Sequence, residues 1–253
     1  MTNPESVIAL YDECREYRRM HRGIYGADQY VDQLDFWTRS EIEQFGRLLQ
    51  LRSGSTLLDV GSGLGGPACL LSRTLNAKIV CIDISDWHIN EARVVAARLG
   101  LCDKVDFSLA DARTFDGDGR LFDAAIAIDS IVHMDPIDLL LKNLARLLRP
   151  RARLLLASEC LSSKAPTQVV QERERAGATK CITEKDLKAA LSANGFQIET
   201  ISRDFKRREC FARAALQWMD GRGYRAGREN MTAILDACEK GGAFEILIIA
   251  RAA

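Results

Sequence analysis

Hydrophobic residues follow two different spacings along this chain, and the change occurs near residue 55. Before it, apolar residues recur three or four positions apart, which is typical of one face of a helix. This predicts a first helix opened by Pro4 and a second over residues 30–50. After it, short apolar runs alternate with longer amphipathic stretches. Runs without a polar face predict strands that are buried on both sides of a parallel sheet.

The short apolar runs are rich in aliphatic residues and lie at 57–60, 78–82, 105–109, 122–128 and 153–157. The segments between them, 65–75, 86–99 and 137–148, are long enough for crossover helices. Ser85 is placed to cap the second of these helices and Gly100 to end it. The alternation predicts an α/β fold with a doubly wound, mostly parallel sheet.

The last third of the chain predicts the edge of this sheet and a helical cap. A polar stretch covers residues 161–180, and Thr183 opens a helix that ends at Gly195. Residues 196–203 and 244–251 are strand candidates, separated by about forty residues of helical, basic character. Together with the five earlier strands they predict seven strands that end in an antiparallel edge pair.

Composition excludes several classes of protein. The 253 residues carry 35 basic and 35 acidic side chains, whereas nucleic-acid-binding domains are usually strongly basic. The sequence has no secretory signal pattern and no apolar run long enough to span a membrane. The eight cysteines are scattered, with no Cys-x-x-Cys pair and no sign of a metal site. We therefore expect reduced thiols and a cytoplasmic protein. A homo-oligomer is compatible with these features.

A glycine-rich turn after the first strand is the strongest chemical signal. In Asp59-Val60-Gly61-Ser62-Gly63-Leu64-Gly65-Gly66 a strand runs into a turn that opens a helix. Glycines let the backbone approach a ligand, and the helix start offers free N–H groups. The pattern also fits a dinucleotide motif. However, Asp59 would repel a pyrophosphate and attract a cationic ligand.

Two further acids follow the next two strands. Asp83 ends the second strand, where a carboxylate accepts both ribose hydroxyls of a nucleoside. Asp111 follows the third strand and is placed to accept from an adenine amino group. Each acid alone is also compatible with a solvated loop carboxylate. Three acids at the ends of three successive strands, beside the glycine turn, instead predict a nucleoside site.

The segments LLDVGSGLGGPACLLS, CIDIS, LADA, FDAAIAIDSIVHM and NLARLLRPRARLLLAS resemble the ordered motifs of class I S-adenosylmethionine-dependent methyltransferases. The resemblance covers residues 55–160 and is strongest to phosphoethanolamine and sarcosine/dimethylglycine N-methyltransferases. Tocopherol and sugar O-methyltransferases are related enzymes that it resembles less closely. The segment IYGADQY, 24–30, also resembles the lid segment of that branch. The resemblance implies S-adenosylmethionine as cofactor, held by Tyr30, Asp59, Gly61, Ser62, Gly63, Gly65, Asp83, Ile84, Asp111, Ala112 and Asp129.

The segment after the fourth strand predicts the catalytic residues. Asp129 and His133 resemble the Asp-x-x-x-His dyad of phosphoethanolamine methyltransferases. If the backbone is helical there, a spacing of four places both side chains on one face, where the carboxylate can orient the imidazole. His133 is then a candidate base, although a structural loop histidine is the simpler alternative. Tyr25 and Trp218 are further candidates for contact with the acceptor, whereas His21 and His88 are expected to be structural.

The acceptor itself is less well defined by the sequence. Residues 176–182 lack the arginine and tyrosines with which phosphobase enzymes bind phosphate, which argues against a phosphobase. The basic run 203–213 predicts either a solvated helix face or an anionic acceptor. No Asn-Pro-Pro-Tyr-like segment follows the fourth strand, so nucleic-acid bases are not favoured.

The sequence therefore predicts methyl transfer to an oxygen, nitrogen or carbon of a small molecule by a single domain. Residues 1–50 would form a helical lid, 51–160 the cofactor-binding core, and 161–253 the acceptor-side cap and closing strands. An NAD-dependent oxidoreductase is disfavoured by Asp59 and by the late position of the glycine turn. A protein of this fold that binds the cofactor for a non-methylating task, as a cyclase or a scaffold, remains the alternative.

Overall fold

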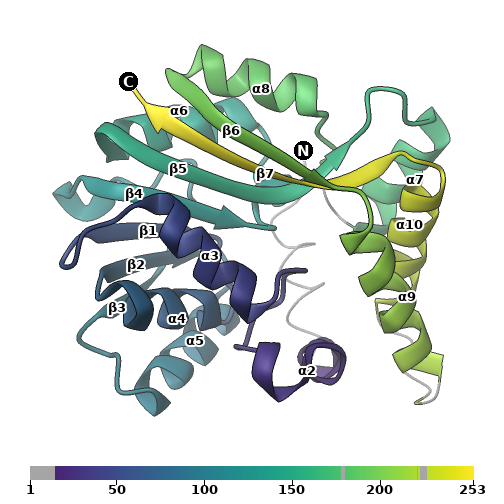
Figure 1. Cartoon of the computed structure of the whole chain (residues 1–253), viewed down its shortest axis with the longest axis horizontal. Helices are drawn as coiled ribbons and strands as arrows, with labels where there is room; N and C mark the ends of the chain where they lie inside the picture. Colours follow the sequence, from purple (N-terminus) through teal and green to yellow (C-terminus); the bar gives the residue numbers. More distant parts are fainter. Residues whose placement is uncertain (1–14, 178–179, 221, 223–226) are drawn as a thin grey trace.

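A computed structural model describes residues 15–177, 180–220, 222 and 227–253. Its sheet has seven strands in the order β3-β2-β1-β4-β5-β7-β6 (Figure 1). β7 pairs antiparallel with both β5 and β6, and the other pairs are parallel. This confirms the predicted fold class. The strands are β1 Thr56–Val60, β2 Lys78–Asp83, β3 Val105–Leu109, β4 Phe122–Ile128, β5 Leu148–Leu161, β6 Phe196–Asp204 and β7 Ala243–Ala252.

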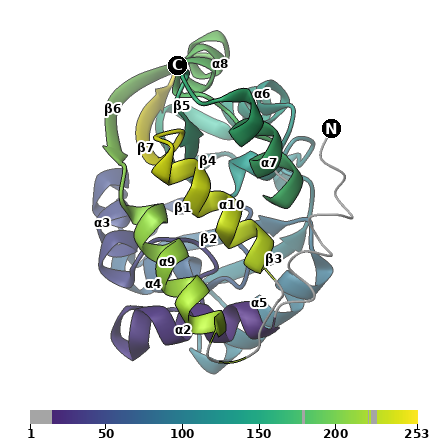
Figure 2. The ribbon, with the colours of Figure 1, turned by 90° about the vertical axis from the view of Figure 1, so that its right-hand side faces the viewer.

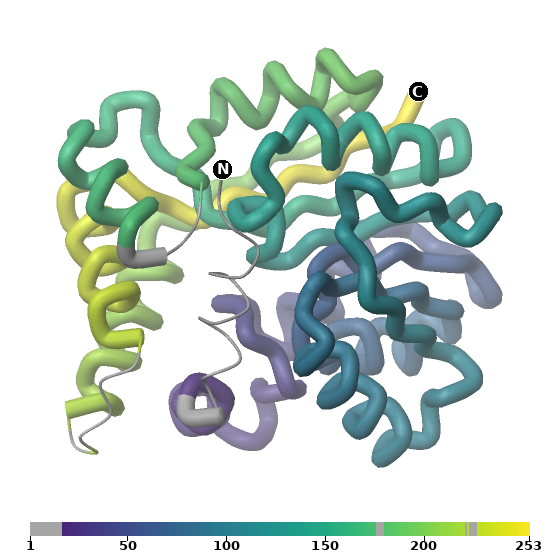
Figure 3. The backbone as a smooth tube through the Cα atoms, turned by 180° about the vertical axis from the view of Figure 1, so that it is seen from behind, coloured from purple at the N-terminus to yellow at the C-terminus, as the bar shows by residue number. Residues whose placement is uncertain are grey.

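Helices cover both faces of the sheet, which explains the uninterrupted apolar strands. Leu57 of β1 packs in the core with α3 (Arg39–Leu49), α4 (Gly66–Leu75) and α5 (Asp86–Arg98). Its neighbour Leu58 faces the opposite core with α6 (Ile137–Leu147) and α8 (Glu184–Ala193). Successive strand residues point to opposite faces, so a strand between two helical layers needs apolar side chains throughout. Figure 3 shows the molecule from behind.

Four helices lie beyond the carboxyl ends of the parallel strands. They are α2 Arg15–Gln29, α7 Thr167–Gly177, α9 Arg207–Asp220 and α10 Arg228–Glu239. Buried residues of α2, α9 and α10 form one apolar cluster, and Figure 2 shows α9 and α10 side by side. Segments from the two ends of the chain therefore form a single cap. α7 occupies part of the stretch that we expected to be merely polar, while the helix expected to open at Pro4 lies outside the described residues.

The prediction of one helix over residues 30–50 is wrong. α2 ends at Gln29 and α3 begins at Arg39, with Thr38 and Glu41 forming a capping box. Between them Asp32 has a φ of 60°, which a continuous helix does not allow. We call residues 31–37 the lid strap. Its apolar residues have helical spacing in the sequence but pack in two different clusters. Phe36 packs in the cap, whereas Trp37 packs in the core between the sheet and α3, α4 and α5.

The lid strap passes directly over the start of α4. A Cβ atom built on Gly66 would lie 1.5 Å from the carbonyl oxygen of Val31. Asp32 is held there by ion pairs with Arg18 of α2 and Arg98 of α5. Gly66 is therefore required by the strap rather than by its own backbone conformation. In the same described ranges, no helix is both long and apolar enough to cross a membrane, and seven cysteines are free thiols.

Replacing Gly66 by Ala should displace the lid strap, because the new methyl group and the Val31 carbonyl cannot occupy the same space. We expect the amides of residues 31–37 to exchange faster with solvent, as measured by hydrogen–deuterium exchange and mass spectrometry. Gly54→Ala is the control, since its φ of 84° adds strain of about 1–2 kcal/mol but no atom lies within 4 Å. Equal exchange at the strap in both variants would contradict the assignment.

Candidate active site

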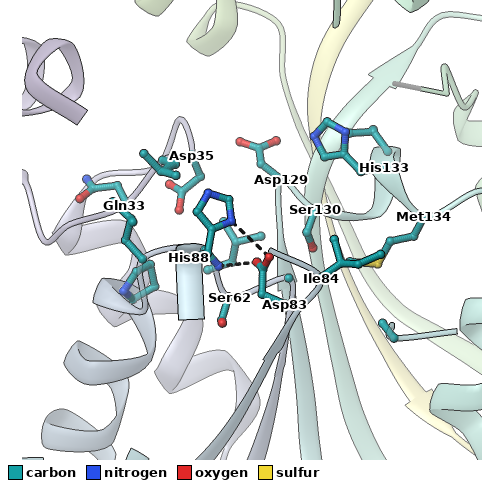
Figure 4. A pocket seen from close by; sticks show the side chains of 18 of the residues that line it. Gln33, Asp35, Ser62, Asp83, Ile84, His88, Asp129, Ser130, His133 and Met134 are labelled. Carbon is teal, nitrogen blue, oxygen red and sulfur yellow. Dashed lines mark hydrogen bonds and ion pairs between the residues drawn. The ribbon is translucent and has the colours of Figure 1, made fainter. Parts of the chain in front are cut away.

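A cavity lies at the carboxyl ends of β1, β2 and β4, the expected ligand position in an open α/β sheet. The empty space in it, including open solvent at the mouth, is about 1280 Å³. The lid strap closes one side, and residues of α7, α9 and α10 close another. Figure 4 shows its main polar residues.

The glycine turn forms the floor of this cavity. Gly61 has a φ of 72°, and a Cβ atom there would lie 2.5 Å from that of Ser130. The Gly63 N–H donates to the Asp83 carboxylate over 2.8 Å, which ties the turn to β2. Gly61, Ser62 and Gly63 line the cavity as expected. Gly65 does not: it precedes α4, and a Cβ atom there would collide with the Phe107 ring at 2.6 Å.

Asp83 presents an ionised carboxylate to the cavity. Burial alone would favour the neutral acid, but hydrogen bonds from His88, Ser85 N–H and Gly63 N–H outweigh it and lower the pKa of Asp83. The His88 Nδ1 atom lies 3.2 Å from Asp83 Oδ1. His88, which we expected to be only structural, itself lines the cavity. Its position in the first turn of α5, five residues after Asp83, was the signal that we missed.

Asp59 lies outside the set of residues that line the cavity. It is 4% exposed in β1, and burial together with the neighbouring charge of Asp83 raises its pKa to about 7. Asp59 is therefore buried in β1 away from the cavity lining, and its direct contact with a ligand stays a prediction. Asp111 does line the cavity, but Arg113 binds both its oxygens and lowers its pKa.

The residues present fit a nucleoside-bearing cofactor. The turn offers a cradle without side chains, and Asp83 offers an anionic acceptor beside it. Ser62 Oγ is buried without a hydrogen-bond partner among the described residues, as expected for a group that meets a ligand. Ile84 and Ala112 add apolar surface. These residues would hold S-adenosylmethionine, with Asp83 placed for its ribose.

Asp129 has partners other than the one we expected. Its Oδ1 accepts from Arg208 Nη2 at 2.5 Å and its Oδ2 from the Phe36 N–H at 3.1 Å. The residue has a φ of 49°, and only residues 131–133 form a 3₁₀ turn. The premise of a common helical face with His133 is therefore wrong. Both side chains nevertheless line the same cavity (Figure 4).

A buried ion network forms the far side of the cavity. Glu159 of β5 accepts from Arg173 Nε and Nη2 of α7 at 3.0 and 2.7 Å. Arg208 of α9 lies 3.3 Å from the same carboxylate and also pairs with Glu245 of β7. Burial opposes ionisation of Glu159, but Arg173, Arg208 and the nearby His133 outweigh it and lower its pKa to about 2. Arg173 also donates to Asn230 of α10.

This network is not predictable from local sequence patterns, because its members are far apart along the chain. Glu245 alone carried a signal, as a charged residue inside an apolar strand. It is fully buried, and burial raises its pKa although Arg208 opposes the shift.

Three further expected ligand contacts lie outside the cavity lining. Tyr25 supports the strap instead, because its hydroxyl donates to the Asp35 carbonyl at 3.1 Å. Tyr30 precedes the strap, and burial raises its pKa to about 12. Trp218 packs against Gly23 of α2, with Arg222 over its ring. The strap residues that replace them are Asp32, Gln33, Leu34, Asp35 and Phe36.

A family described as "Methyltransferase domain" matches residues 57–151, the region of the glycine turn and of Asp83, Asp111 and Asp129. The O-methyltransferase rstn1 of Aspergillus nomiae is 30% identical over 181 residues, which is 71% of this chain and 80% of that protein. The O-methyltransferase resE of Aspergillus sclerotiorum is 29% identical over 181 residues, covering 71% of this chain and 69% of that protein.

Solved structures share the fold. Phosphoethanolamine N-methyltransferase 2 of Haemonchus contortus, in complex with phosphomonomethylethanolamine and S-adenosylhomocysteine, has a TM-score of 0.79 at 14% identity over 97% of this chain and 59% of that one. The [4+2]-cyclase SpnF has a TM-score of 0.78 at 24% identity over 98% of this chain and 96% of that one. At these identities the likeness concerns the fold alone.

Because the folded-state pKa of Asp59 is raised, its neutral form stabilises the protein and ionisation destabilises it. This contribution is complete below the unfolded pKa near 4 and is lost as the pH rises towards about 7. Asp59→Asn should remove a loss of up to about 4 kcal/mol over that range. We expect urea unfolding of the ligand-free protein to show a flatter pH profile in the variant than in the wild type. Parallel profiles from pH 4 to pH 7.5 would show that Asp59 titrates normally.

Proposed function

The chain belongs to the class I S-adenosylmethionine-dependent methyltransferases, and on that premise we propose that it methylates a hydroxyl group of a neutral small molecule, with His133 as general base. Transfer of a methyl group from S-adenosylmethionine to a small-molecule acceptor follows from the family. The choice of oxygen, the neutrality of the acceptor and the role of His133 are our proposals. The relatives named O-methyltransferases support the choice of oxygen.

The observation that carries the proposal is the position of His133. It lines the cavity beyond the end of β4, in the part bordered by the ion network. The imidazole lies close enough to the Glu159 carboxylate for the two groups to interact electrostatically. A hydroxyl acceptor must lose its proton during methyl transfer, and a positioned base typically contributes 10²–10⁴-fold. An imidazole supported in this way is suited to take that proton.

The charges in the part of the cavity beside the ion network, where we place the acceptor, favour an acceptor without net charge. Arg173 and Arg208 are paired with Glu159 and Asp129, so neither guanidinium offers an uncompensated charge. The basic run 203–213 supports the same conclusion, because Arg203, Arg207 and Arg213 each pair with a glutamate. An anionic acceptor would find no unpaired arginine among these residues.

The cofactor supplies a methyl group activated by its positive sulfur. The protein positions the reactants, which can contribute roughly 7–11 kcal/mol. Asp83 and the glycine turn would hold the nucleoside, while the lid strap and the cap exclude water from the cavity. His133 accepts the hydroxyl proton on an imidazole nitrogen as the acceptor oxygen becomes alkylated.

We further propose that the protein acts in the cytoplasm and without nucleic acid. Support comes from the seven free thiols in the described ranges and from the equal numbers of acidic and basic residues.

We also propose that the chain is divided into a lid, a core and a cap as the sequence predicts, with one adjustment. Because α3 packs in the core below the sheet, the lid contribution at the cavity comes from α2 and the strap.

His133→Ala should lower kcat by 10²-fold or more with the true acceptor at saturating cofactor, while cofactor affinity measured by calorimetry stays unchanged. The reason is loss of the base at the reacting oxygen. Met134→Leu is the matched control, since it changes the next residue along the cavity without an ionisable group. A rate within threefold of wild type would leave His133 as a structural residue. A protein that binds the cofactor but never methylates any hydroxyl acceptor would refute the proposed reaction.

Asp129→Asn distinguishes two roles for Asp129. Either it stabilises the contact between the lid strap and α9, or it acts only as the partner of His133. Asp129→Asn leaves Arg208 paired with Glu159 and Glu245, but it weakens the hydrogen bonds from Arg208 and from the Phe36 N–H. Hydrogen bonds to a charged group are worth about 1.5–3 kcal/mol each. We therefore expect a marked loss of stability in urea unfolding. Asp111→Asn breaks a half-exposed ion pair and should cost about 1 kcal/mol or less. If Asp129→Asn kept wild-type stability and lost only kcat, the dyad interpretation would be correct instead.

A further inference from the structure

Asp35 is a buried acid in the lid strap that the proposed mechanism does not use. Its side chain is 7% exposed, and it lines the cavity, into which Figure 4 shows its carboxylate directed. The Trp37 N–H donates to Oδ1 at 2.8 Å, and the Tyr25 hydroxyl donates to the backbone carbonyl at 3.1 Å. The first contact orients the side chain, and the second anchors the backbone that carries it. No motif of the sequence pointed to it.

The strap brings this carboxylate towards acids that already surround the cofactor end of the cavity. The adjacent Phe36 N–H donates to Asp129, so Asp35 and Asp129 are held close together. Burial, first of all, and the charges of Asp129 and Asp59 raise the pKa of Asp35 well above its usual range. Asp83 adds an ionised carboxylate at the floor. The strap therefore holds several acids together in a buried place, where ionising all of them is unfavourable.

The neighbouring cations do not relieve this repulsion. Arg208 is engaged by Asp129, Glu159 and Glu245, and the charge of Arg207 is directed to Glu41 and Asp204. Within the chain as described, Asp35 itself forms no ion pair. A buried acid of this kind is stabilised when a cation binds beside it. A cationic group bound in the cavity would therefore stabilise the ionised form of Asp35.

We propose that Asp35 is the counter-charge for a cationic group of the cofactor, so that the lid strap closes tightly only over a cofactor that carries this cation. S-adenosylmethionine has two such groups, the sulfonium and the amino-acid ammonium. S-adenosylhomocysteine keeps only the ammonium, and 5′-methylthioadenosine has neither. The proposal rests on the cofactor of the family. It does not depend on His133 or on a hydroxyl acceptor, and its test needs no acceptor.

The test compares the binding of these three compounds to wild type, Asp35→Asn and Asp28→Asn by calorimetry at one pH. Asp35→Asn keeps the shape and removes the charge. Asp28→Asn is the control, because Asp28 is an exposed acid of α2 outside the cavity lining. We expect Asp35→Asn to weaken S-adenosylmethionine at least tenfold, with 5′-methylthioadenosine changed less than twofold and with no effect of Asp28→Asn.

S-adenosylhomocysteine identifies the cation. If its affinity is retained, Asp35 faces the sulfonium, and loss of that charge in the product favours reopening of the strap. If its affinity falls with that of S-adenosylmethionine, Asp35 faces the ammonium. Unchanged affinity for all three compounds, or equal loss for all three, would overturn the proposal.

Hydrogen exchange supplies a second measurement that does not depend on affinity. In wild type, saturating S-adenosylmethionine should slow exchange at residues 31–37 more than saturating 5′-methylthioadenosine does. In Asp35→Asn this difference should disappear. Equal protection of the wild-type strap by both compounds would also overturn the proposal.

Discussion

The carboxylate of Asp129 joins three parts of the chain at the end of β4. It accepts from the Phe36 N–H, 93 residues earlier, and from Arg208, 79 residues later. The lid strap, the sheet and the cap therefore meet at one buried anion. A buried charge without partners is costly, so the strap and α9 must both be in place for this site to be stable. Closure of the cavity depends on this constraint.

The start of α9 strengthens the same junction. Arg208 lies 4.4 Å from the centre of the Phe36 ring, and Arg207 lies 4.0 Å from that of Trp37. Such cation–π contacts contribute about 0.5–2 kcal/mol each, most when water is excluded. Two consecutive arginines of the cap thus hold two consecutive aromatic residues of the strap. Since Phe36 and Arg208 both line the cavity, this junction supports its strap side and its cap side together.

The acids of the cavity divide into two kinds by their environment. Hydrogen bonds from His88 and two backbone N–H groups keep Asp83 ionised, whereas burial beside Asp83 raises the pKa of Asp59 to about 7. Two neighbouring acids in a sheet cannot both be ionised at low cost. The glycine turn binds the Asp83 carboxylate at the floor of the cavity, so the acid that stays ionised is the one that faces the cavity. This arrangement is suited to a cofactor with hydroxyl and cationic groups.

The sequence by itself determined the sheet, its order of crossover helices, the glycine turn and the position of Asp83. These features are recorded in patterns of residues close in sequence, such as strand alternation, helix caps and the turn at Gly61. It did not determine the strap or α7. In the strap, the spacing of Leu34 and Trp37 fits a helix as well as it fits the extended segment that the structure has. Only the tertiary structure placed Asp35 in the cavity and joined Glu159 to Arg173 and Arg208. Those contacts join segments distant in sequence, and periodicity records only which residues are buried, never which distant residue is buried beside them.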